Sequence, residues 1–64
     1  MHTVILSGLV GWAHSVYQVL IDAGYECELI TKGNLVVVYD TTSAAVDQFL
    51  SSKGYGGGVS TEVD

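Results

Sequence analysis

Positive charge is nearly absent from this chain, which has two lysines and no arginine against seven carboxylates, a net charge of −5 over 64 residues. Nucleic-acid-binding proteins need lysine and arginine to neutralise phosphates, so the composition argues against direct binding of DNA or RNA. A negative field instead speeds encounter with a basic protein surface. No charged residue precedes Asp22, so the acids are confined to the last two thirds of the chain.

A second cysteine is also absent, so Cys27 cannot form an intrachain disulfide. A lone cysteine is typical of a reducing, intracellular setting, and on a predicted strand it is expected to be a small buried hydrophobe and not a reactive thiol. The uncharged N-terminal segment lacks the basic region of a signal peptide, and His14, Ser15 and Gln18 interrupt any apolar run of membrane-spanning length. We expect a cytoplasmic protein without membrane contact.

Catalytic and metal-binding patterns are missing as well. His14 and Asp22 would lie about 12 Å apart along a helix, too far to share one ion. A triad of Ser7, His14 and Asp40 can be written down, but no nucleophile-elbow pattern supports it. The glycine-rich stretch Gly54–Gly58 follows a predicted helix, whereas phosphate-binding loops precede one. We therefore predict no enzyme, no metal site and no cofactor.

Apolar residues are plentiful. The chain is 48% hydrophobic with a mean hydropathy of +0.40, which is typical of a folded protein. At this length we expect a single domain over residues 1–64. A chain this short buries only about 60% of the surface that its unfolded form exposes, and small folds gain stability by pairing with another chain. A homodimer or a bound partner is therefore expected.

The first part of the chain predicts a strand followed by a helix. Thr3–Ser7 is short, β-branched and apolar, and Gly8 and Gly11 permit a turn after it. From Trp12 the apolar residues recur at helical spacing, with polar residues on the opposite side. Gly24 is suited to end this helix.

The middle of the chain predicts a β-hairpin. Residues 25–30 alternate with period two, which places Glu26 and Glu28 together on a solvated face. Thr31–Asn34 is typical of a hairpin turn, and the continuous apolar run Leu35–Tyr39 is typical of an interior strand.

The last part of the chain predicts a second helix and a C-terminal segment. Asp40–Ser43 offers several N-caps, and an apolar stripe carries the helix to Lys53 and Gly54. Residues 54–58 are interpreted as a glycine-rich connector. Residues 59–64 alternate in polarity and are expected to form either an edge strand or a tail.

The order of elements predicts an α+β fold, a two-layer ferredoxin-like sandwich of β-α-β-β-α with a short final β. Right-handed crossovers and pairing of the two most apolar strands put residues 4–6 beside residues 35–39, with both helices on one face. The opposite face would carry Glu26 and Glu28 and be partly apolar. Such a face is a candidate contact surface.

Several segments resemble an ACT-type regulatory domain: Gly8–Gly11, then Ala23–Ile30, then Val36–Leu50. In that family a glycine opens the first helix, an alanine-glycine pair closes it, and the next strand follows directly. The resemblance implies that a small metabolite binds near the first loop, at a dimer interface. The corresponding ligand-binding residues would be Gly8, Gly11 and Trp12.

The acids are expected at the surface, because burying an ionised carboxylate without a partner is costly. A negative patch could compete with nucleic acid for a basic groove, with Glu62 and Asp64 adding to the field. The predicted partner-binding residues are Asp22, Glu26, Glu28, Asp40 and Asp47.

In size, acidity and lack of catalytic residues the chain is similar to small phage-encoded inhibitors such as anti-CRISPR proteins. This resemblance implies a viral protein of the host cytoplasm that inhibits or modulates a nucleic-acid-binding partner by occupying its basic surface. Three alternatives stay open: the ACT-like metabolite-binding domain, a module that pairs with itself through the open sheet face, and acids that only keep the domain soluble.

Overall fold

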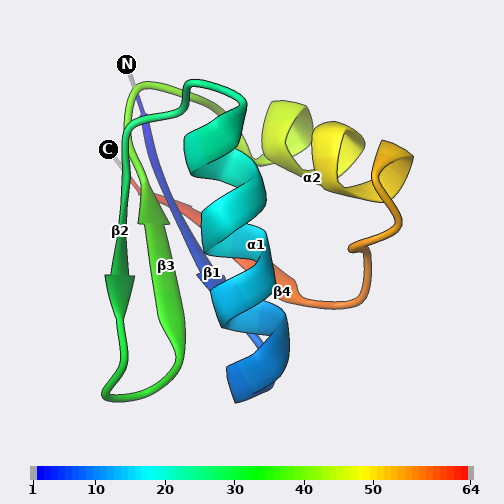
Figure 1. Ribbon diagram of the computed structural model, residues 1–64. Coiled ribbons are helices and arrows are strands. Elements are labelled where there is room, and N and C mark those ends of the chain that lie inside the picture. Colours follow the sequence, from blue (N-terminus) through cyan, green and yellow to red (C-terminus); the bar gives the residue numbers. More distant parts are fainter. Residues whose placement is uncertain (1, 64) are drawn as a thin grey trace.

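A computed structural model of the chain describes residues 2–63 and confirms the predicted ferredoxin-like sandwich (Figure 1). The final segment forms a strand over the part that is described, while Asp64 lies outside the described residues. The elements in chain order are β1 (Thr3–Ser7), α1 (Val10–Asp22), β2 (Cys27–Ile30), β3 (Leu35–Val38), α2 (Ser43–Ser52) and β4 (Val59–Val63).

The strands form one antiparallel sheet in the order β2-β3-β1-β4. The two most apolar strands, β1 and β3, lie at its centre, as their sequences predict. The register pairs Val4 with Val38 and Ser7 with Leu35, while Ser7 also pairs with Val59 on the other side. The sheet edges are therefore β2 on one side and β4 on the other.

Both helices pack on one face of the sheet, because alternate residues of β1 and β3 share a buried cluster with residues of α1 and α2. Burying these side chains is the main source of stability in so small a fold. Among the described residues this core consists of Val4, Leu6, Ala13, Val16, Leu20, Val36, Val38, Val46 and Leu50.

The sheet face away from the helices is called the open face below. It carries the other alternate residues of each strand, and its central positions are only partly buried. At its edges Ile30, Val59 and Val63 are exposed by 39%, 64% and 40%. The prediction of a partly apolar, uncovered face is confirmed.

Both helices end in the same way, with a glycine in the left-handed conformation followed by a tyrosine. Gly24 has φ +93° and Gly54 has φ +84°. The amide of Tyr25 donates to the carbonyl of Leu20, and the amide of Tyr55 donates to the carbonyl of Leu50. These bonds define a Schellman motif at each helix end, where only glycine adopts the required φ without strain.

The start of α1 differs from the prediction. The helix begins at Val10, so Gly11 lies in its first turn and does not form a loop. The residue before the helix is Leu9, which has no side-chain oxygen with which to cap it. The sequence therefore contains no capping signal at the true helix start.

Trp12, at the start of α1, contacts the connector between α2 and β4 and holds it in place. Its indole Nε1 donates to the carbonyl oxygen of Tyr55 at 2.9 Å. The indole ring also lies so close to Gly8 and Gly58 that a Cβ atom at either position would collide with it. Trp12 packs against the core, as its place on the predicted apolar side of the helix indicates.

We predict that Gly58→Ala destabilises the fold by about 1–3 kcal/mol, because the new methyl group overpacks the contact with Trp12. Gly56→Ala is the matched control in the same connector: its Cβ would meet the Ser51 hydroxyl at an ordinary 3.6 Å. That control should leave stability unchanged or raise it slightly, because alanine restricts the unfolded chain. Urea unfolding measures both, and equal losses in the two variants would contradict the proposed contact.

Candidate functional site

Three of the predicted acids gather at one end of the sheet, where β2 begins and β3 ends. Asp22 is the last residue of α1, Glu26 directly precedes β2, and Asp40 follows β3 by two residues. The amide of Tyr39 donates to the carbonyl of Glu26 at 2.9 Å, which ties the start of β2 to the end of β3. Figure 1 shows the end of α1 and the β3-α2 connection at this same end of the molecule.

Glu28 extends this group of acids onto the open face. It pairs with Val37 in the sheet, and its carboxylate accepts a hydrogen bond from the Tyr39 hydroxyl at 3.0 Å. Cys27 and Leu29 point the other way and pack against the core. The prediction that the glutamates occupy the solvated face of this strand is confirmed. We call Asp22, Glu26, Glu28 and Asp40 the acidic group.

The backbone of Asp40 adopts a left-handed conformation with φ +57°. Aspartate tolerates this region better than most residues because its side chain is short and polar. The next amide, of Thr41, donates to the carbonyl of His2 at 3.0 Å. The sharp turn from β3 toward α2 thus places the exposed Asp40 at the end of the sheet.

Asp47 lies apart from the acidic group, on α2 and next to the opposite sheet edge. Its carboxylate accepts a hydrogen bond from the Ser60 hydroxyl of β4 at 3.0 Å. Of the five predicted partner-binding residues, Glu26, Glu28 and Asp40 therefore lie on or beside the β2-β3 hairpin, Asp22 ends α1 in the helix layer, and Asp47 lies beside β4. The side chain of Asp47 contributes to the attachment of β4 to α2.

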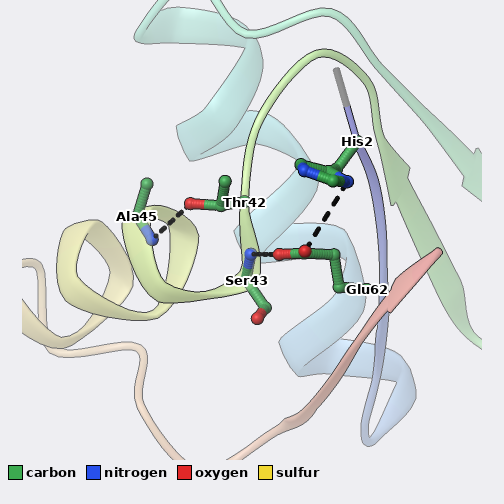
Figure 2. Close-up of polar contacts among 5 residues, drawn as sticks. All are labelled: His2, Thr42, Ser43, Ala45 and Glu62. Atoms are coloured by element: carbon green, nitrogen blue, oxygen red, sulfur yellow. Dashed lines mark hydrogen bonds and ion pairs between the residues drawn. The ribbon is translucent and has the colours of Figure 1, made fainter. Parts of the chain in front are cut away.

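Glu62 likewise bonds within the fold (Figure 2). Its carboxylate accepts a hydrogen bond from the backbone amide of Ser43 at 2.8 Å, at the N-terminus of α2, and lies 3.7 Å from His2 Nδ1. A carboxylate at a helix N-terminus satisfies an amide without an intrahelical partner and interacts favourably with the helix dipole. The Thr42 hydroxyl accepts from the amide of Ala45 at 3.2 Å, as the sequence predicts for an N-cap in this region.

The residues suggested by the ACT resemblance have separate surroundings. The space beside Gly8 is filled by the indole of Trp12, whereas Gly11 is exposed and faces open space on α1. Trp12 also lines a cavity of about 240 Å³ between α1, α2 and the connector. The other residues lining it are Leu6, Asp47, Leu50, Ser51, Tyr55, Gly56, Gly57 and Gly58.

A groove of about 420 Å³ between the ends of the two helices was not anticipated from the sequence. Asp22 and Lys53 both line it, together with Phe49 and Tyr55. Lys53 Nζ lies 5.8 Å from the centre of the Phe49 ring. Of the two glycine-tyrosine pairs at the helix ends, only Tyr55 lines this groove, so no local pattern in the sequence indicates where it forms.

Cys27 is partly buried, and burial raises the pKa of its thiol. A raised pKa reduces the thiolate fraction at neutral pH, and the thiolate is the reactive form. This agrees with the interpretation of Cys27 as a small hydrophobe on a strand.

Comparison with family models, curated proteins and solved structures finds no significant match for this chain. The likenesses to ACT domains and to small phage-encoded inhibitors therefore stay predictions. Neither helix in the described part of the chain has the length and apolarity needed to cross a membrane. Within residues 2–63, no three potential metal ligands lie close enough together to hold an ion.

The contact between Tyr39 and Glu28 raises the pKa of the phenol, chiefly through the hydrogen bond, then through partial burial and the negative charges of Glu28 and Glu26. We predict that Glu28→Ala lowers this pKa toward the usual tyrosine value, and that Glu26→Ala lowers it less. Because the folded pKa is raised, the contact stabilises the fold below the unfolded pKa of tyrosine, and this is lost as pH rises through the folded pKa. A pH titration of the tyrosine ring carbons by NMR measures the shift, and equal effects of the two variants would contradict the assignment.

Removal of either acceptor at the N-terminus of α2 should destabilise the protein. We predict that Thr42→Ala and Glu62→Ala each cost about 1 kcal/mol of unfolding free energy, because each leaves a helix amide without its partner. Glu26→Ala removes a carboxylate outside the helix end and is the control. Urea unfolding compares the three variants, and a loss for Glu26→Ala as large as that for Glu62→Ala would contradict a specific capping role.

Proposed function

We propose that the protein is a non-catalytic interaction protein that inhibits or modulates a nucleic-acid-binding partner by occupying its basic surface. The observation that carries the proposal is the acidic group. Its members Asp22, Glu26, Glu28 and Asp40 are all exposed, at or near the end of the sheet where β2 begins and β3 ends. In the described part of the chain, no lysine forms an ion pair with any of them.

The electrostatics of this group suit a partner that normally binds phosphates. Exposed carboxylates on the β2-β3 hairpin and at the end of α1 produce a negative potential that attracts lysine and arginine and speeds encounter. The same residues on the partner would otherwise contact nucleic acid. Occupation of the basic surface by the acidic group would therefore exclude nucleic acid from it.

The open face adds apolar area beside the acids. Val37 and Ile5 pair in the centre of the sheet, and Glu28 pairs with Val37 at its β2 side. Protein interfaces commonly combine an apolar centre with a polar rim. The acidic group and the adjoining part of the open face therefore support a partner with basic residues around a small apolar patch.

The distribution of hydrogen bonds also supports a role for the acidic group outside the fold. Asp47 and Glu62 bond to Ser60 and to the amide of Ser43, and so connect α2 with β4. Within the acidic group, Asp22 accepts from Gln18 and Glu28 from Tyr39, and both of these bonds are exposed. Surface contacts of this kind contribute little to stability. The carboxylates of Asp22 and Glu28 can therefore leave these contacts and bind a partner.

To test the proposal, Glu26→Gln and Glu28→Gln are combined, which raises the net charge from −5 to −3. The control combines Ser15→Lys with Gln48→Lys, two exposed positions of the helical layer, and gives the same net charge. The wild-type protein should recover a basic nucleic-acid-binding protein from a host lysate and release a labelled DNA or RNA from it. The glutamine variant should lose both effects, and the control should keep them.

Added salt should weaken the complex, since the interaction depends on charges that salt screens. Recovery of no basic nucleic-acid-binding protein would contradict the proposal. So would an equal loss in the two double variants, because net charge and not the acidic group would then control binding.

A further inference from the structure

The outer edge of β4 is an unprotected strand edge. β4 pairs with β1 along its whole length, from Val59 to Val63, and within residues 2–63 no other strand pairs with it. Natural proteins protect such edges with lysine, proline, a bulge or a covering segment. β4 contains neither lysine nor proline, and its register with β1 advances one residue at a time without a bulge.

The direction of the β4 side chains follows from its pairing with β1. Thr61 pairs with Ile5 and, with Val59 and Val63, belongs to the open face. Ser60 and Glu62 belong to the helix side, where they bond to Asp47 and to the amide of Ser43. The charge of Glu62 is thus directed toward its own α2, leaving two exposed valines and a threonine on the open face of the edge.

The sequence of β4 is complementary to itself in antiparallel pairing. If a second copy pairs with β4 about a two-fold axis at Thr61, Val59 lies opposite Val63, and Ser60 lies opposite Glu62. No two like charges face each other, and the exposed valines meet in pairs on the open face. Such apolar cross-strand pairs stabilise a sheet, whereas opposed like charges destabilise it.

The other edge does not have this property. β2 carries Glu28 and directly follows Glu26, both on the open face. Two copies joined through β2 would bring two acidic groups together, and like charges at short distance repel. The structure therefore offers one edge that suits self-association and one that opposes it.

We propose that the protein forms a two-fold symmetric dimer through antiparallel pairing of β4 with β4, which makes a continuous eight-stranded sheet. The second copy satisfies the free backbone groups of the edge and covers Val59 and Val63, which are 64% and 40% exposed in one copy. The acidic group of each copy remains at the outer edge. The dimer is argued from β4 alone and does not depend on the proposed function, so an experiment can contradict either one without contradicting the other.

Cysteine substitution tests both the dimer and its register, in a background with Cys27→Ala. In the proposed pairing Thr61 lies opposite its own counterpart, at a Cα separation of about 5 Å that a disulfide can span. Val59 lies four residues, or about 14 Å, from its counterpart. Under mild oxidation T61C should become mostly a disulfide-linked dimer, whereas V59C should stay uncrosslinked.

A double variant, V59C with V63C, restores crosslinking in the proposed register, because each cysteine then faces the other in the second copy. A T61C yield no higher than that of V59C would overturn the proposal. So would failure of V59C with V63C to crosslink under conditions that crosslink T61C. Circular dichroism confirms that each variant is folded before oxidation.

A reversible measurement complements the crosslinks. Thr61→Lys places two lysines opposite each other on the symmetry axis, so the mass measured by light scattering should fall by half relative to the wild type. Ile30→Lys is the matched control, an exposed open-face residue on the β2 edge, and should leave the dimer intact. A wild-type protein that is monomeric at millimolar concentration, or a dimer that Ile30→Lys dissociates and Thr61→Lys does not, would overturn the proposal.

Discussion

The contact of Trp12 with the connector is the interaction on which the second half of the fold depends. Four glycines among residues 54–58 give the connector a large conformational entropy when it is unfolded, and ordering it is costly. Trp12 fixes both ends of the segment, through its hydrogen bond to Tyr55 and its ring contact with Gly58. β4 can then pair with β1, and only then can Ser60 and Glu62 reach α2. Capping of α2 is thus linked to a tryptophan in the first turn of α1.

The core of this small fold lies on one side of the sheet only. The helices cover one face of the sheet, so the other face and both edge strands stay accessible. The two edges differ in chemistry: β2 carries Glu28 and follows Glu26 directly, and β4 presents valine and threonine on the open face while its glutamate bonds to α2. This division allows one edge to meet a basic surface and the other to meet a second copy.

Local patterns in the sequence were sufficient to predict the order and type of the first five elements, and they left the final segment as either an edge strand or a tail. Alternation in residues 25–30 separated the glutamates from Cys27, and glycines 24 and 54 indicated where the helices end. The start of α1 was predicted too late because Leu9 supplies no capping side chain. For the same reason Gly11, a glycine in the first helical turn, was interpreted as part of a loop.

Contacts between residues distant in sequence could not be predicted in this way. The requirement for glycine at position 58 depends on Trp12, which lies 46 positions earlier, and no local pattern connects the two. Asp47 and Glu62 looked like surface acids because their partners, Ser60 and the amide of Ser43, are supplied by other elements of the fold. The closeness of Glu26, Glu28 and Asp40 needs no such contact, since these residues lie on or beside β2 and β3 and the hairpin register alone brings them to one edge of the sheet. Their role in binding a partner stays a prediction.

Net negative charge does not prevent the β4-linked dimer, because of where the charges lie. In an eight-stranded sheet the two β2 strands are separated by seven strand spacings, or about 34 Å. This exceeds the screening length of about 8 Å at physiological ionic strength several-fold, so the two acidic groups repel each other only weakly. The two groups would also face different directions, because adjacent strands twist relative to one another. The dimer would therefore present two separate acidic surfaces, and a partner with two basic sites, or two copies of one partner, could be bound at the same time.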